Sequence, residues 1–463
     1  WASLTAESRA ALGQAFSLRR QAGELARAGK SHEARPLLDR ALAITGKILG
    51  LNHITTANSL TYSAKLYYAQ GQYSQAQPLL ERVLAITEKT QGPDHPNTAA
   101  SLNNLAQLYY SQGKYVQALS LTQRALEIRE RVLGLDHPDT ATSLGNLAVL
   151  YKAQGQYAQA EPLSRRALAI TEKALGPDHP DTATSLNNLA ELYYAQGQYA
   201  QAEPLSQRAL GIREKTLGPD HPITATSMNN LAGLYKAEGR YAQAELLSRR
   251  ALAITEKALG PDHPETATSL NNLAGLYEAQ GQYAQAEPLS RRALAITEKA
   301  LGPGHPITAT SLNNLALLYE ALEQYAEALP LAQQALTILE NTLGYDHPSL
   351  ATSLNNLAAL HVAQGQYNQA LPLYQRALRT FETVLGPAHG TTAIGLKNLA
   401  VAKLEYQPDE ATGLLLLRAC QVKWQYLTRT FPTLSTTAQQ RFLAKSQLGT
   451  TPQYFWPLFT ALP

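Results

Sequence analysis

The sequence predicts an all-α fold, a right-handed solenoid of about ten antiparallel helix pairs. The main observation is a strict repeat, because nine of the 11 histidines follow one another at steps of 42 residues. An Asn-Asn-Leu-Ala block recurs with the same step, and no segment alternates apolar and polar residues as a half-buried strand would. A long period in an apolar-patterned chain indicates stacked supersecondary units. The nine histidines are His53, His95, His137, His179, His221, His263, His305, His347 and His389.

Each unit is expected to contain two helices, as residues 180–218 illustrate. Pro180 suits the first position of a helix, where the missing N–H has no helical partner to lose. Apolar residues then recur at three- and four-residue steps, which is the spacing of one helical face. Gly197 separates this helix from a second one, and Gly218 followed by Pro219 ends the second helix.

Prolines in the second half of the units conflict with this pattern. They fall a few residues inside the expected second helix, where proline removes a hydrogen bond and crowds the preceding turn. We therefore expect these helices to begin late or with an irregular first turn. The prolines are Pro36, Pro78, Pro162, Pro204, Pro288, Pro330 and Pro372.

The composition narrows the functional classes. Lys and Arg total 39 and Asp and Glu total 36, a net charge of +3 that is too balanced to indicate nucleic acid or an anionic membrane as partner. No apolar run approaches the ~18 residues of a membrane span, and residues 1–20 lack the pattern of a signal peptide. We therefore expect a cytoplasmic protein. Because the chain begins at Trp1 and its one methionine is Met228, we expect a piece of a longer product.

One unit shows which family the repeat is similar to. The run NNLAELYYAQGQYAQAEPLSQRAL resembles the tetratricopeptide repeat, with small Ala190 and Ala202 where the helices cross and Gly197 in the turn. The 42-residue period and the LGPDHP connector are similar to the kinesin-light-chain subtype of that repeat. The resemblance covers roughly residues 20–430.

This resemblance divides the chain into four segments. Residues 1–54 are an atypical N-terminal capping repeat, in which Arg19, Arg20 and Ser31 depart from the pattern. Residues 55–388 hold eight 42-residue repeats, and residues 389–430 form a degenerate capping helix pair with Lys397 at a variant position. Residues 431–463 are a non-repeat tail. That tail is similar to the connector before the CHAT domain of some bacterial proteins. The similarity implies that this chain is the tetratricopeptide part of such a protein.

No combination of residues indicates catalysis or a cofactor. Equivalent histidines in neighbouring units are expected at least about 8–10 Å apart, whereas zinc ligands lie about 2 Å from the ion. Cys420, the one cysteine, is expected to be a buried, inert thiol. Gly29-Lys30-Ser31 lacks the earlier glycine and the preceding strand of a phosphate-binding loop. We expect a protein that is not an enzyme and that binds neither metal nor cofactor.

The repeated asparagines are the main functional candidates. Asparagine costs a helix about 0.5 kcal/mol relative to alanine, so its recurrence within helices indicates a repeated purpose. Its amide matches the N–H and C=O of an extended peptide, and the resemblance implies that such asparagines hold a peptide backbone on the concave face. The alternative is that they bond neighbouring helices inside the solenoid. The two asparagines of a pair lie about 100° apart on the helix, so one can serve each purpose. The groove candidates are Asn104, Asn146, Asn188, Asn230, Asn272, Asn314 and Asn356.

Specificity is expected from positions on the same face that differ between units. Three and six residues after the second asparagine, the units carry different side chains. The groove is expected to be more basic near Lys152 and Lys236 and more acidic near Glu278 and Glu320, and Tyr194 belongs to the same set. A plain solvated surface is the alternative interpretation.

Three functions fit these observations. The leading one is a non-catalytic scaffold that binds an extended peptide or a partner protein in its concave groove. The second is a sensor or regulatory arm of a larger signalling protein of the CHAT or NTPase type. The third is a self-assembling, filament-forming unit, because head-to-tail contacts that fail to close make filaments. The third function rests on the near-identical repeats and on the aromatic tail residues Tyr454, Phe455, Trp456 and Phe459.

Overall fold

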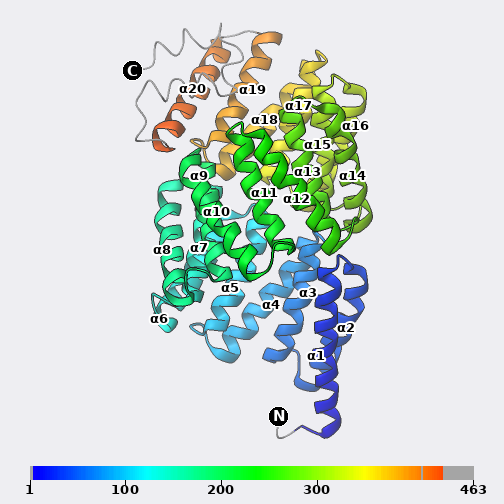
Figure 1. The fold of residues 1–463 in the computed structure, drawn as a ribbon, viewed down its shortest axis with the longest axis vertical. Helices are drawn as coiled ribbons and strands as arrows, with labels where there is room; N and C mark the ends of the chain where they lie inside the picture. The colour runs from blue at the N-terminus through cyan, green and yellow to red at the C-terminus, as the bar shows by residue number, and fades with distance from the viewer. Residues whose placement is uncertain (1–3, 408–409, 431–463) are drawn as a thin grey trace.

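The chain is an array of helix pairs. A computed structural model describes residues 4–407 and 410–430. Twenty α-helices and no strand occur in these ranges, which confirms the predicted all-α solenoid of ten antiparallel pairs. The array winds from α1 at one end of the molecule to α19 and α20 at the other (Figure 1). The CHAT-like connector and the aromatic tail expected from the sequence lie outside the described residues.

The first helix of a pair begins, in seven units, at the proline predicted for its first position. The proline lacks an N–H where no intrahelical acceptor exists, so the residue does not weaken the helix. These first helices are α1 (Ala6–Arg27), α3 (Ile54–Ala69), α5 (Pro96–Ser111), α7 (Pro138–Ala153), α9 (Pro180–Ala195), α11 (Pro222–Ala237), α13 (Pro264–Ala279), α15 (Pro306–Ala321), α17 (Pro348–Ala363) and α19 (Gly390–Tyr406).

The second helix of eight pairs begins at a tyrosine, which in seven of them follows the turn glycine by two residues and in α16 follows Glu323. A π-helical turn, η1, directly follows α18. The second helices are α2 (Ser31–Leu49), α4 (Tyr73–Gln91), α6 (Tyr115–Leu133), α8 (Tyr157–Leu175), α10 (Tyr199–Thr216), α12 (Tyr241–Leu259), α14 (Tyr283–Leu301), α16 (Tyr325–Leu343), α18 (Tyr367–Thr380) with η1 (Phe381–Leu385), and α20 (Glu410–Thr430).

The expectation that the proline-containing helices begin late is wrong. In α8 the helix starts at Tyr157, five residues before Pro162, and continues through it. No side chain caps the first turn. Backbone hydrogen bonds close it instead, since the N–H groups of Gln159 and Ala160 both donate to the Gln156 carbonyl at 3.1 Å. Pro162 is exposed, so its ring lies on the solvent side and the helix loses one hydrogen bond there rather than its start.

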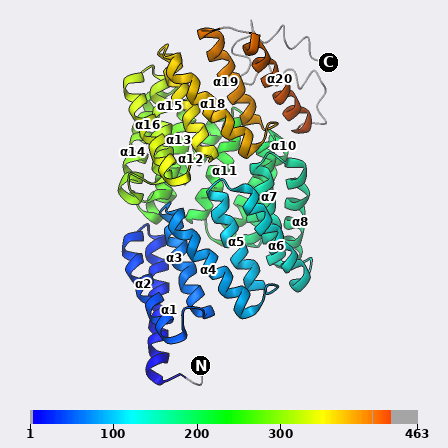
Figure 2. The ribbon, with the colours of Figure 1, turned by 180° about the vertical axis from the view of Figure 1, so that it is seen from behind.

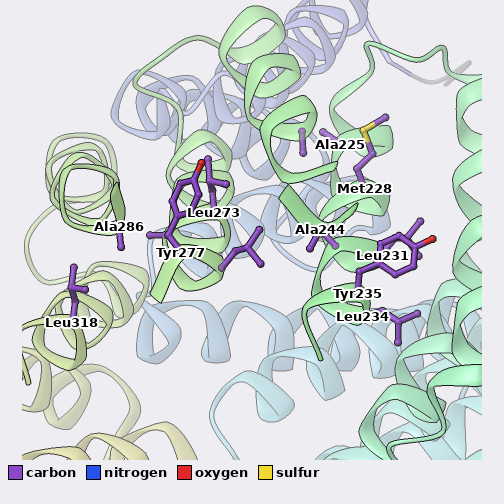
Figure 3. Packing of buried hydrophobic residues seen from close by; sticks show 14 of the residues in the cluster. Ala225, Met228, Leu231, Leu234, Tyr235, Ala244, Leu273, Tyr277, Ala286 and Leu318 are labelled. Carbon is purple, nitrogen blue, oxygen red and sulfur yellow. The ribbon is translucent and has the colours of Figure 1, made fainter. Parts of the chain in front are cut away.

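Small residues allow the paired helices to approach closely. Ala202, Ala244 and Ala286 are 1%, 0% and 0% exposed, as the repeat pattern predicts. Figure 3 shows Ala244 of α12 beside Leu231 and Tyr235 of α11. One buried cluster between first and second helices extends from unit to unit between α7 and α17, and smaller clusters fill other helix interfaces of the described array.

Exposed or partly exposed ion pairs connect seven of the second helices to the preceding unit on the outer surface, namely α6, α8, α10, α12, α14, α18 and α20. Arg208 of α10 contacts Glu172 of α8 at 2.6 Å, and Lys215 contacts Asp178 of the preceding connector at 2.5 Å. The same two pairs recur along the array with the cation always in the later unit. Exposed pairs of this kind contribute little stability individually, because water and salt screen them.

Candidate functional site

The first asparagine of each pair joins neighbouring first helices. Asn229 of α11 donates through Nδ2 to Ser269 Oγ of α13 at 3.1 Å, and Asn271 donates in the same way to Ser311 of α15 at 3.2 Å. Asn103 and Asn187 make the same contact with Ser143 and Ser227, whereas in the pair of Asn313 and Ser353 the serine Oγ donates to the asparagine Oδ1 at 3.2 Å. The accepting serines are buried, so this asparagine satisfies a polar group inside the solenoid.

The same serines also bond the second helix of the preceding unit. Thr255 of α12 donates to Ser269 at 3.4 Å, and in two other units an arginine replaces the threonine. Arg129 donates to Ser143 at 2.9 Å and Arg213 donates to Ser227 at 2.6 Å. Burial lowers the pKa of both guanidinium groups. Each serine is therefore a junction of three helices from two adjacent units.

The second asparagine of the pair has a different environment. Among the described residues, none of the seven predicted groove asparagines has a hydrogen-bond partner in the protein. Asn230 and Asn272 are exposed, and Asn104, Asn146, Asn188, Asn314 and Asn356 are partly exposed. The leucine that follows each of them is buried, for example Leu231 at 3% exposure. In each pair, the first asparagine thus makes an internal hydrogen bond, and the amide of the second remains at the surface.

A pocket of about 370 Å³ lies on this surface, between the first helices of units four to seven. Its walls include four of the predicted site residues on different helices, Lys152 of α7, Tyr194 of α9, Asn230 of α11 and Asn272 of α13. Asn229 also lines the pocket, and its Oδ1 is a buried acceptor without a donor. The remaining lining residues are Asn187, Ala190, Glu191, Ala195, Ala202, Ser206, Gly233 and Leu234.

Two glycines widen the groove beside this pocket. Gly233 and Gly275 stand three residues after the second asparagine, where neighbouring units carry Val149, Glu191 and Leu317. A Cβ added at Gly233 would meet no atom within 4 Å, so the space above it is open. A Cβ at Gly275 would lie 3.6 Å from the Lys236 ammonium, which therefore extends over the next unit.

The charges in the groove differ in part from the sequence expectation. Lys152 forms an ion pair with Glu191 at 2.8 Å, and the Lys152 side chain is only 20% exposed. The expected basic character near Lys152 is therefore wrong, because a carboxylate one unit further along neutralises it. The sequence placed both residues on the groove face but did not reveal that the side chains meet.

The acidic positions are half-buried. Burial raises the pKa of the Glu278 carboxyl, and nearby Lys236 opposes this shift. Burial also raises the pKa of the Glu320 carboxyl. Tyr194 is 43% exposed, and its ring lies 5.8 Å from that of Tyr199. The groove thus combines surface amides, an open pocket and carboxyl groups that burial disfavours in the charged form.

The sequence profile of the tetratricopeptide repeat family matches the chain in nine overlapping stretches: residues 14–89, 61–131, 98–173, 146–215, 181–257, 239–299, 265–341, 307–383 and 349–415. The chain belongs to the tetratricopeptide repeat family. Its candidate groove is accordingly formed by the first helices of tetratricopeptide repeats. No curated protein sequence matches the chain.

Solved structures similar to this tetratricopeptide array include a putative kinesin light chain with nearly identical TPR-like repeats from Podosopora anserina. It is 34% identical, covers 44% of this chain and 97% of its own, and has a TM-score of 0.38. BtubC from P. vanneervenii is 24% identical over 50% of this chain and 91% of its own, with a TM-score of 0.39. A Rap protein complexed with competence and sporulation factor is 16% identical over 80% and 99%, and its TM-score of 0.53 shows a shared fold.

The histidines of this tetratricopeptide array cap its first helices. In each case the imidazole Nδ1 accepts a hydrogen bond from the backbone N–H two residues later, as His95 does from Asn97 at 3.1 Å. A capping acceptor satisfies one of the N–H groups that a helix start leaves without a partner. No group of three or more potential metal ligands occurs within the described ranges. The repeat period predicted the positions of these histidines, but their capping role was not predicted.

The other sites that the sequence argued against are structural positions in the tetratricopeptide units. Cys420 is fully buried in α20, and burial raises the pKa of its thiol to about 11. Lys30 and Ser31 lie where α2 begins, after a helix and a turn rather than a strand. Of the helices in the described residues, none is both long and apolar enough to cross a membrane.

Proposed function

We propose that this tetratricopeptide repeat protein is a scaffold that binds an extended peptide segment of a partner protein along its groove of second asparagines. The observation that supports the proposal best is the division within each asparagine pair. The first asparagine makes the internal bond, so the second is not needed to hold the units together. Its amide offers a donor and an acceptor to an extended backbone at every unit.

The pocket supports the same function. An extended peptide directs alternate side chains to opposite sides, so a side chain that faces the groove needs a recess. The recess beside Gly233 is lined by apolar Ala190 and Leu234 and by amide groups, which suits a side chain with an apolar stem and a polar end. A Rap protein with the same fold was solved complexed with competence and sporulation factor.

The test compares neighbouring residues of the same helices. Peptides that bind the wild-type protein are first selected from a displayed library of random dodecapeptides. The double variant Asn230→Ala/Asn272→Ala should bind the selected peptide more weakly, by about 0.5–1.5 kcal/mol for each lost hydrogen bond. Its thermal stability should remain close to that of the wild type, because alanine improves helix propensity.

The outcomes distinguish groove binding from an internal role. A drop of several degrees in the melting temperature of Asn230→Ala/Asn272→Ala, with unchanged peptide affinity, would assign the second asparagines to the solenoid interior. Selected peptides that bind the double variant as tightly as the wild type would place the binding surface elsewhere.

A further inference from the structure

Units that are far apart in the sequence meet where the superhelix returns on itself. The turn between α3 and α4 in unit two contacts the start of α15 in unit eight, and three other turns make the equivalent contact six units later. The N-terminal helices accordingly lie directly below α13–α16 in both views (Figures 1 and 2). We call this contact line the seam. Its turn glycine and capping histidine pairs are Gly29 with His263, Gly71 with His305, Gly113 with His347 and Gly155 with His389.

The imidazole of His305 is bonded on both sides of the seam. Its Nδ1 accepts from the Ile307 N–H at 3.0 Å and thereby caps α15. Its Nε2 lies 3.1 Å from the Ala69 carbonyl oxygen at the end of α3. The two contacts together require the neutral tautomer with its proton on Nε2, which then donates to the carbonyl. His305 is only 5% exposed, whereas the His179 side chain in a middle unit is 40% exposed.

The close approach across the seam depends on glycine. A Cβ at Gly71 would lie 2.4 Å from Pro306 Cδ, and a Cβ at Gly155 would lie 2.7 Å from the His389 ring. The equivalent turn of unit eight carries Glu323 at φ 59°, so this turn tolerates a side chain where no later unit packs against it. The seam glycines are therefore required for the contact in addition to the turn geometry.

The seam joins opposite edges of the units. Each first helix runs from its capping histidine at one edge of the unit to its turn glycine at the other. At the seam, the turn-glycine edge of units one to four therefore contacts the capping-histidine edge of units seven to ten. No space for a side chain remains between these edges at Gly71. At these four contacts the coil is closed on itself.

We propose that the seam is a reversible lock on the superhelix that controls access to the groove. With the seam closed, a peptide reaches the groove from the ends of the coil. With the seam open, units one to four separate from units seven to ten and a segment tethered at both ends in a partner protein can enter from the side. The control of access rests on the proposed peptide-binding function, whereas the lock itself does not.

Glycine substitutions with matched controls test the lock. The seam variant is Gly71→Asn/Gly155→Asn, and the control is Gly239→Asn/Gly281→Asn. All four glycines have φ between 68° and 77°, but an added Cβ meets no atom within 4 Å at the control positions. Asparagine tolerates positive φ better than most residues, so both variants carry a similar local cost. Small-angle X-ray scattering of the full chain should show a larger radius of gyration for the seam variant alone.

A second pair of variants opens the seam without adding bulk. In His305→Asn/His347→Asn the shorter side chain still caps its helix but does not reach the carbonyl of the opposite turn. The control is His179→Asn/His221→Asn, at the same capping positions in middle units. Expansion of the seam pair with unchanged helical circular dichroism supports the lock, and dimensions equal to those of the control in both experiments would refute it.

Binding kinetics then test the control of access. A dodecapeptide selected on the wild type is inserted into a surface loop of a folded carrier protein, so that both its ends are tethered. Its association rate should rise several-fold with the seam variants and remain unchanged with the controls. Expansion without a faster association would refute control of access. A wild type that binds no peptide would count against the groove function, and the scattering result would still decide whether the lock exists.

Discussion

At the scale of single residues, adjacent asparagines on one helix have separate roles. Asn229 bonds Ser269 across to the next unit, whereas Asn230 is exposed and lines the pocket. The sequence analysis assigned the groove role to the second asparagine but did not show what the first one bonds, because that depends on where the neighbouring helix lies. The serine that settles it, 40 residues later in the chain, was not recognised as a partner.

The first prediction concerns this internal bond. Asn229→Ala/Asn271→Ala removes two donors to buried serines, so we expect a loss of about 0.5–1.5 kcal/mol for each hydrogen bond, partly offset by better helix propensity. Thermal melts of this double variant and of Asn230→Ala/Asn272→Ala measure the difference in their stability. Equal melting temperatures for the two double variants would contradict the division of roles.

The second prediction concerns close packing. Ala244 is fully buried where α12 approaches α11, so Ala244→Leu should overpack the core and destabilise the protein by about 1–3 kcal/mol. Leu246→Ala is a suitable control on the same helix, because that leucine is 71% exposed. Chemical denaturation of both variants tests this, and an unchanged midpoint for Ala244→Leu would show that the helices can separate freely at this point.

At the scale of helices, glycine inside a helix has different consequences in different units. Gly233 of α11 faces open space in the groove, whereas a Cβ at Gly395 of α19 would lie 3.2 Å from the Phe381 ring. In other units a threonine and a serine occupy the positions of Phe381 and Gly395, as Thr297 and Ser311 do. The large ring thus fills the space that the missing serine side chain leaves, and the π-helical turn η1 begins at this residue.

The third prediction uses these two glycines as a matched pair. Gly233→Ala should stabilise the protein by about 0.5–1 kcal/mol, because alanine is the better helix former and its methyl group meets nothing. Gly395→Ala should be neutral or destabilising, because the same gain is opposed by contact with the buried ring. The denaturation midpoints of the two variants show whether each substitution raises or lowers stability. A stabilised Gly395→Ala would show that Phe381 can move.

At the scale of the whole molecule, the array is a chain of similar interfaces closed by the seam. The helix count, the turn glycines and the buried alanines were predictable, because each follows from a pattern within one or two units. The seam and the ion pair of Lys152 with Glu191 were not predictable, because both depend on the rotation between successive units. That rotation is set by packing details that a repeat pattern does not contain.

The fourth prediction concerns pH. Burial lowers the pKa of His347 and His389 to about 4, and it also lowers that of His305. The turns and connectors at these three contacts carry glycine, glutamine, proline, alanine and tyrosine, apart from Lys114 and Asp346 beside His347. With the seam open, these histidines bind protons at their ordinary pKa near 6.5, so the closed form loses stability as the pH falls from about 6.5 to 4.

The measurement is small-angle scattering from pH 7 to pH 4.5 at constant ionic strength. The wild type should expand as the pH falls, while His305→Asn/His347→Asn should be expanded already at pH 7 and should change less. A wild-type radius of gyration that is constant across this range would show that protonation does not open the seam.

From α6 to α14 the outer ion pairs join one unit to the next in the same order, an arginine with glutamate and a second cation with aspartate. Any unit of this stretch can therefore follow any other, and a 42-residue segment can be duplicated or deleted in the gene with complementary charges at both new junctions. Recombination can therefore change the number of units in the array one unit at a time. Because the seam pairs each unit with the sixth one after it, an array of six units has no seam contact and every further copy adds one.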